Sequence, residues 1–341
     1  MPMKGQEDTN RPIDRLRDGA GSFDLNTPDD DSEIAEMITI DGRLLVVKSK
    51  GIYEIKLADQ IDPDRTNIGA PNTIQRILPF GSDHPWVGAV VLTAHGLLKS
   101  TYLPREIDCD RALVLVLGIA QDIAATLELV EKYKEAQEAA IRSLDPKIRK
   151  DRSVMVPAIG NVEVRCKEFL QKSDHALREL FKVVKLFYAD VGTGGWESLK
   201  SKIEQGPQDI DNFSQFLSNA LPMLQLVRNA RNCVEHPRKE QRIEVSDFSV
   251  DAKNNLLPPM VEIIYPETPR EKMPVADFMV QISQSLVDVV ELILVYLCAR
   301  RVKSLSGFPV QVVEIPPDRR RSANVRYGYG SAIGEQIIPM S

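Results

Sequence analysis

Aromatic residues and cysteines are both scarce in this chain of 341 residues. Aromatics make up 6% of it, so a core must be built mainly from aliphatic side chains, which suits packed helices. Four cysteines lie far apart, with no CxxC pair and no Cys/His cluster at metal-ligand spacing. This spacing supports neither a zinc site nor a disulfide framework, and we expect no metal and no cofactor.

An excess of positive charge is also missing. The formal net charge is −6, which argues against a protein that coats nucleic acid or anionic membrane by bulk electrostatics. Polar residues interrupt the two most apolar stretches, 112–120 and 282–298, so we interpret both as core helices rather than membrane spans. The polar N-terminus has no apolar segment of the kind found in secretion leaders. We therefore expect a cytoplasmic protein.

The first third of the sequence predicts a flexible leader followed by a small α+β subdomain. Residues 1–32 are rich in Gly, Pro, Asn and charge, which predicts disorder. Within 33–105, three short β-rich runs are separated by Asp41-Gly42 and Lys50-Gly51 turns, which predicts an antiparallel meander. A helix over 87–103 is expected to close this subdomain.

The remainder is predicted to be a helical domain over 106–306 and a tail over 307–341. Apolar residues recur at three- and four-residue spacing along four segments, 110–144, 161–188, 209–236 and 275–303. Two alternating runs, 242–250 and 256–265, predict a β-hairpin inserted before the last helix, and the tail contains one expected strand at 310–315. The predicted class is mainly α, with a helical bundle at its centre.

The stretch Arg231-Asn232-Cys233-Val234-Glu235-His236 is where the sequence points to chemistry. A guanidinium pairs bidentately with a phosphoryl group, and an imidazole exchanges a proton near neutral pH. Pro237 disfavours the α conformation at His236, so we expect the helix to end there, with the imidazole at its cap. Phosphate-binding candidates surround the motif and make this strip locally cationic: Arg228, Arg238, Lys239 and Arg242.

Long helices around an Arg-Asn-x-x-x-His segment resemble the HEPN superfamily. The resemblance covers about 106–306 in helix pattern and three residues in motif: Arg231, Asn232 and His236. It implies a helical bundle that dimerises and forms a composite, metal-independent endoribonuclease site, with toxin–antitoxin or phage-defence roles and a protein antidote as a partner. Arg231 would bind the scissile phosphate, and His236 would transfer a proton. Asn232 would orient either the Arg231 or the His236 side chain.

Two other hypotheses stay open. One is a HEPN-like module that binds RNA, a nucleotide or a protein without cleavage. The other is a structural helical scaffold, because Arg and His near a helix C-terminus also suit its dipole and free carbonyls. Of the other titratable side chains, His95 and His175 lie in expected helices with no partner pattern, and Cys233 is expected to be buried and inert.

Overall fold

The computed structural model describes residues 11–19, 25, 27, 30–143, 152–192, 194–206, 212–305, 307, 309–333 and 336–339. The chain divides into two compact units, Met1–Pro85 and Trp86–Ser341. We call them the N-terminal unit and the helical unit. Helix accounts for about 49% of the structure, and the class is α+β overall because sheets occur in both units.

A four-stranded antiparallel sheet forms the core of the N-terminal unit. Its strands follow the order of the chain: β1 (Glu36–Ile40), β2 (Arg43–Val47), β3 (Ile52–Lys56) and β4 (Thr73–Leu78). Asp41 and Gly42 have φ angles of 51° and 70°, the left-handed geometry that a tight hairpin needs between β1 and β2. The predicted meander is therefore confirmed. The fourth strand was missed because the side chains of residues 73–76 are all exposed, so no apolar alternation marks it.

Part of the segment predicted to be a flexible leader is ordered, so this prediction was wrong for residues 12–18. They form helix α1 (Pro12–Asp18), with Pro12 at its first position. Arg17 donates to Asp59 at 2.7 Å and to Asp62 at 3.2 Å, and only 7% of its side chain is exposed. These long-range ion pairs join α1 to residues in and next to the short helix α2 (Ala58–Ile61). They stabilise α1, and the amino-acid composition of the leader does not reveal them. Residues 1–10 of the leader lie outside the described residues.

The helical unit begins earlier than the predicted domain limit at residue 105. A π-helical turn η1 (Val87–Leu92) leads into helix α3 (Thr93–Leu97), and both pack against the long helices. The expected single helix over 87–103 thus ends at Leu97 rather than before Pro104. Almost every side chain in 87–97 is buried, which explains why these residues fold with the bundle rather than with the sheet.

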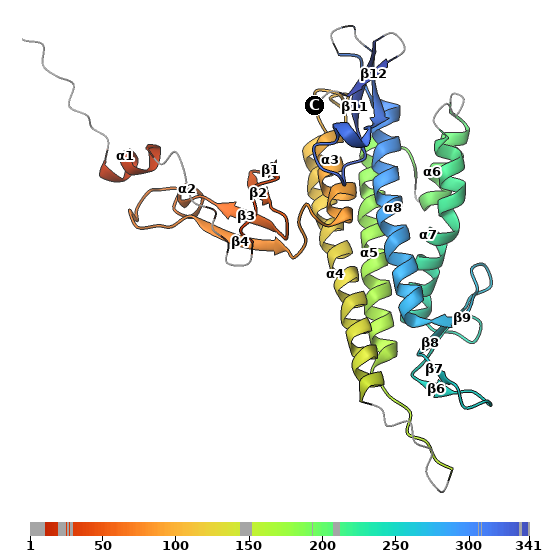
Figure 1. The fold of residues 1–341 in the computed structure, drawn as a ribbon. Helices are drawn as coiled ribbons and strands as arrows, with labels where there is room; N and C mark the ends of the chain where they lie inside the picture. Colours follow the sequence, from red (N-terminus) through yellow and green to blue (C-terminus); the bar gives the residue numbers. More distant parts are fainter. Residues whose placement is uncertain are drawn as a thin grey trace, which may run out of the picture. The chain divides into compact units, whose positions relative to one another are not determined.

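Long helices form the body of this unit (Figure 1). They are α4 (Cys109–Arg142), α5 (Val162–Phe187), α7 (Phe213–Glu235) and α8 (Val275–Arg301), and a shorter helix, α6 (Gly195–Glu204), packs on α7. Helix α5 contacts α4, α7 and α8, so it is the central member. The four predicted helices agree with the observed ones to within a few residues, whereas α6 was not predicted.

Small sheets cover the two ends of the bundle (Figure 1). At one end, β5 (Arg242–Ser246), β8 (Met260–Ile264) and β9 (Arg270–Pro274) form a sheet beside a two-stranded ladder of β6 (Ser249–Val250) and β7 (Leu256–Leu257). The predicted hairpin is present here with an additional strand, β9. At the other end, β10 (Val310–Glu314), β11 (Tyr327–Ile333) and β12 (Gln336–Pro339) form a sheet where only one strand was expected, with the short 3-10 helix η2 (Pro317–Arg319) between β10 and β11.

Helices α4 and α8 are long and apolar enough to cross a membrane by length and composition. In each, 61% of the most apolar window is buried inside the protein. Both therefore serve as core helices of this unit, packing side chains such as Phe278 of α8 against Phe169 of α5.

Candidate functional site

Helix α7 places the motif at the end of the bundle where β5, β8 and β9 lie (Figure 1). Its buried face includes Leu217, Leu224 and Val227, spaced so that they point to one side of the helix. The helix ends at Glu235, and His236 leaves the helical conformation with φ −135°. The backbone N–H of His236 still donates to the Asn232 carbonyl at 2.8 Å, which holds it against the last turn. The predicted cap position of His236 is confirmed.

His236 and Arg231 differ in exposure and in pairing. The imidazole of His236 is exposed, whereas 21% of the Arg231 side chain is exposed. The guanidinium contacts two carboxylates: Nη2 lies 2.5 Å from Glu235, and Nε lies 3.6 Å from Asp174 of α5. A third nitrogen, Nη1, donates to the Asn232 side chain at 3.3 Å. Three side chains thus contact the Arg231 guanidinium, and the two carboxylates among them partly neutralise its charge.

Asp174 is the buried member of this network. Only 8% of its side chain is exposed, and Arg178 contacts it at 2.7 Å from one turn further along α5. Burial raises the pKa of Asp174, while the nearby Arg178 and Arg231 lower it. At 3.6 Å, Asp174 lies beyond hydrogen-bond distance of Nε, so it attracts the Arg231 guanidinium as an ion-pair partner at the junction of α5 and α7.

The predicted phosphate-binding residues separate into two groups. Arg228 pairs with Glu197 of α6 at 3.4 Å, and Arg242 pairs with Glu244 at 2.8 Å, so both are already occupied. Among the described residues, neither Arg238 nor Lys239 forms an ion pair. These two exposed cations follow His236 and Pro237 in the chain, and an incoming anion would not have to displace a carboxylate from either.

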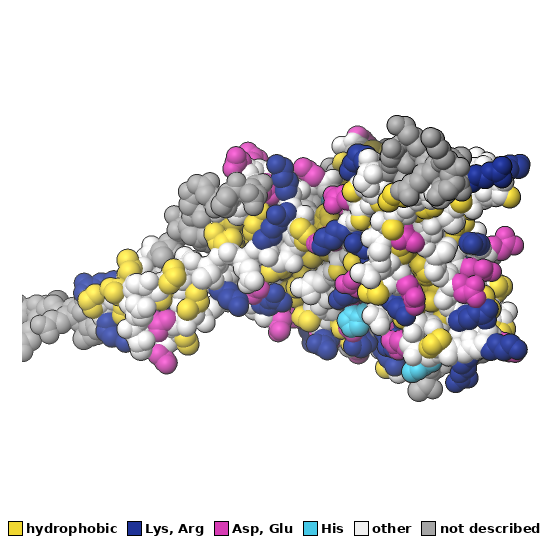
Figure 2. Space-filling model, turned by 90° about the horizontal axis from the view of Figure 1, so that it is seen from below, with side chains coloured by type: hydrophobic (Ala, Val, Ile, Leu, Met, Phe, Trp, Pro, Cys, Tyr) yellow, Lys and Arg dark blue, Asp and Glu magenta, His cyan; other side chains and the backbone are white. Residues whose placement is uncertain are grey.

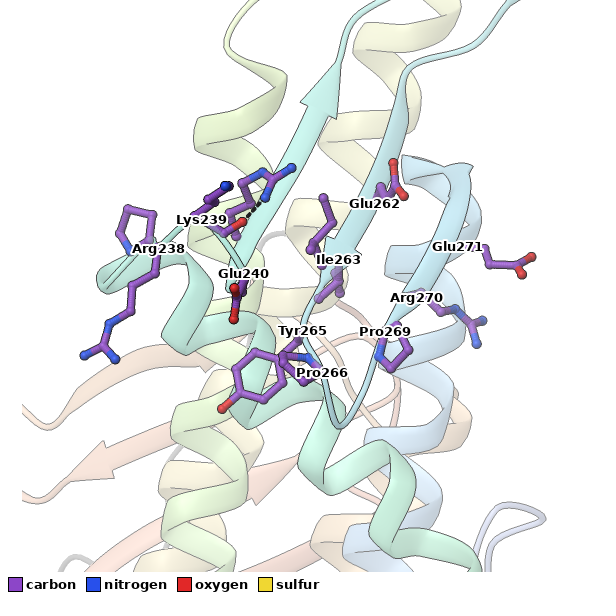
Figure 3. A pocket seen from close by; sticks show the side chains of 13 residues that line it. Arg238, Lys239, Glu240, Glu262, Ile263, Tyr265, Pro266, Pro269, Arg270 and Glu271 are labelled. Atoms are coloured by element: carbon purple, nitrogen blue, oxygen red, sulfur yellow. Dashed lines mark hydrogen bonds between the residues drawn. The ribbon is translucent and has the colours of Figure 1, made fainter.

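Arg238, Lys239 and Arg242 line a pocket between the α7–β5 turn and the β8–β9 loop (Figure 3). Its volume is about 970 Å³, at the upper end of the roughly 300–1,000 Å³ typical of small-molecule sites. Arg270 adds a fourth cation, and an apolar wall completes the pocket with Ile263, Ile264, Tyr265, Pro266 and Pro269. The pocket begins at Pro237, the residue after His236, and Arg231 does not line it.

Several residues at this site escaped the sequence analysis. Asp174 lies four residues after Leu170 and three before Leu177, on the buried face of α5, and a carboxylate at such a position is a pattern that could have been noticed. His175, for which no partner was foreseen, contacts buried Asp122 of α4 through Nδ1. Tyr265 had no distinguishing pattern, because its role depends on how a loop folds back on α7.

Cys233 lies inside the motif but faces inward. It is 2% exposed, and burial raises the pKa of its thiol. Its Sγ lies 3.9 Å from the Ile264 carbonyl, within reach of a weak hydrogen bond that joins α7 to β8. The cysteine therefore serves packing, as expected, and offers no accessible nucleophile.

Charge on the face of the molecule seen in Figure 2 is mixed rather than concentrated. Figure 2 shows basic and acidic side chains intermixed over the face seen there, with histidines among them. Comparison with protein-family models, curated proteins and solved structures gives no match for this chain.

Proposed function

We propose that this chain is a HEPN-like protein that binds RNA and cleaves it without a metal ion. The observation that carries the proposal is the exposed His236 at the end of α7, one helical turn beyond an Arg231 that pairs with Asp174 and Glu235. A guanidinium and an exposed proton-transfer group at the same helix end suit phosphodiester cleavage when no metal takes part.

In the proposed reaction, the RNA supplies its own nucleophile. The imidazole of one His236 removes the proton from a ribose 2′-hydroxyl, and the oxygen attacks the adjacent phosphorus. The bond from phosphorus to the 5′-oxygen breaks, and that oxygen receives a proton from a second imidazole. Arg231 stabilises the negative charge that accumulates on the phosphoryl oxygens, and Asn232 orients Arg231.

Two imidazoles are required at the same moment, which is why we propose a homodimer that brings two copies of the motif together. We further propose that the protein acts in the cytoplasm, in a toxin or phage-defence role with a protein antidote as its partner. These proposals follow from the resemblance of Arg231, Asn232 and His236 to the HEPN motif.

The pairing of Arg231 with Glu235 favours a second candidate, an RNA- or nucleotide-binding module without cleavage. At 2.5 Å, Glu235 occupies the guanidinium edge that a phosphate would use, so the phosphate must displace it. A purely structural role for Arg231 is less well supported, because 21% of its side chain reaches solvent.

Cleavage of labelled single-stranded RNA in the presence of EDTA tests the proposal. His236→Ala should abolish cleavage while preserving the fold and the dimer, and Arg231→Ala should do the same. A matched control is His95→Ala on α3, whose imidazole lies near Lys99 at the other end of the bundle and should not affect cleavage.

Mixing unaltered and His236→Ala protein under conditions of subunit exchange tests the shared site. If a site needs two imidazoles, a mixed dimer is inactive and activity should fall as the square of the fraction of unaltered chains; a fall in simple proportion to that fraction would show the composite arrangement to be wrong. RNA binding with no cleavage by the unaltered chain would instead establish the binding module.

A further inference from the structure

We propose that the pocket after His236 is a subsite for one nucleotide of single-stranded RNA, in which Tyr265 stacks on a base while Arg238 and Lys239, which point in different directions in Figure 3, contact the phosphates on either side of it. The proposal takes its ligand class from the proposed function and adds a second part to the site. Pro237, the residue after His236, lines the pocket, so a strand bound there reaches the end of the motif helix.

The loop that carries Tyr265 is fixed to the motif helix at two points. Cys233 contacts the carbonyl of Ile264, the residue before Tyr265. Asn229, which is 2% exposed, donates to the Thr268 hydroxyl at 3.1 Å. These contacts position the backbone of the loop, and thus the point from which Tyr265 projects, relative to α7.

Tyr265 itself is half-buried, so part of this aromatic residue is accessible to a ligand. Among the described residues it makes no hydrogen bond and no ring contact, unlike Tyr296 or Tyr329, which pack against other aromatic rings. A partly exposed aromatic ring beside cations is the combination that binds single strands, because every base has a face that stacks.

Arg238 and Lys239 are presented by a rigid turn. The backbone groups of Arg238 and Gln241 bond to one another in both directions, at 2.8 and 3.1 Å, which closes a tight loop over Lys239 and Glu240. Neither cation has a carboxylate partner within the described part of the chain, so a phosphate would not have to displace one.

Three carboxylates also line this pocket, and their directions decide whether an anion can enter. In Figure 3, Glu262 and Glu271 point away from Tyr265, while Glu240 points toward it. A carboxylate beside a stacked base can accept a hydrogen bond from an amino group of that base. Glu240 therefore contacts the base rather than the phosphate in this arrangement.

Fluorescence anisotropy of a labelled single-stranded oligoribonucleotide measures the subsite directly. All variants are made in full-length His236→Ala protein, so that cleavage does not interfere, and each is checked for an unchanged melting temperature. Tyr265→Ala should weaken binding about tenfold, the scale of losing one base–aromatic contact. Tyr265→Phe should retain binding, and Tyr265→Leu, which keeps an apolar side chain, should lose it as Ala does.

The salt dependence of binding tests the phosphate contacts. The double variant Arg238→Ala/Lys239→Ala should lower the slope of log affinity against log salt by about 0.7 per lost phosphate contact. Lys253→Ala removes an exposed lysine outside the pocket, in the β6–β7 loop, and should leave both affinity and slope unchanged.

Two results would overturn the subsite: Tyr265→Leu that binds as tightly as the His236→Ala parent, or an oligomer with abasic positions that binds as well as the intact one. Cleavage by the unaltered chain together with Tyr265-independent binding would refute the subsite alone. Tyr265-dependent binding without cleavage would support the subsite and refute the nuclease. Absence of RNA binding by the unaltered chain would refute both.

Discussion

Replacing Glu235 by Gln should free Arg231 without destabilising the protein. The Arg231–Glu235 pair spans four residues with the cation first, which is the weaker order, so it contributes at most about 0.3 kcal/mol. Glu235 is also the last residue of α7, where its charge opposes the helix dipole at a cost of about 0.3–1 kcal/mol. These effects cancel, so the free energy of unfolding should change by less than about 0.5 kcal/mol.

The same change should tighten RNA binding. A unit charge about 4 Å from a phosphate costs about 1 kcal/mol in water, which corresponds to roughly fivefold in affinity. Anisotropy with His236→Ala protein, with and without Glu235→Gln, measures this gain, and urea unfolding measures the stability.

Glu163→Gln is the matched control for Glu235→Gln. Glu163 also forms an i,i+4 pair, with Lys167 at 2.7 Å, but it lies in the first turn of α5, where a negative charge is favourable. Its replacement should cost about 0.5–1 kcal/mol and leave RNA affinity unchanged. If Glu235→Gln instead costs more than about 1 kcal/mol and does not tighten RNA binding, the pair is structural and the reasoning fails.

Two further predictions concern other parts of the helical unit. Arg326→Leu leaves Glu291, a fully buried residue of α8, without its main partner. The free energy of unfolding should fall by about 2 kcal/mol. This is less than the cost of breaking a fully buried pair, because 42% of the Arg326 side chain is exposed. Burial already raises the pKa of Glu291, so the loss should be smaller at pH 5 than at pH 8, and equal losses in urea unfolding would contradict this. Cys233 should not react with Ellman's reagent at neutral pH until the protein is unfolded, and rapid labelling of native protein, absent in Cys233→Ser, would show the thiol to be accessible.

Sequence patterns predicted the parts of the fold that depend on local periodicity. The four long helices and the first three strands follow from apolar spacing and from turn residues such as Asp41-Gly42. Helix α1 and strand β4 could not be predicted in this way, because distant ion pairs and pairing with a neighbouring strand stabilise them. For the same reason only one of the strands in the tail was predicted, since β11 and β12 are each stabilised by pairing with another strand.

At the candidate site, the sequence predicted the helix-end position of His236 but not the residues that contact the motif. The cap position of His236 follows from Pro237, a strictly local effect. The contact of Arg231 with Asp174 joins positions 57 residues apart on two helices, and no spacing rule links them. The same holds for the loop that carries Tyr265, which contacts α7 through Ile264 and Thr268.

The last sheet has a consequence for how the helical unit is made. The Tyr329 hydroxyl donates to the Leu97 carbonyl at 2.6 Å, and its ring packs on Tyr102, so β11 closes over residues synthesised more than two hundred positions earlier. Contacts of such long range form late during folding, because the entropy of closing the loop is lost before they are gained. The end of α3 therefore lacks its contact with β11 until residue 329 has emerged from the ribosome.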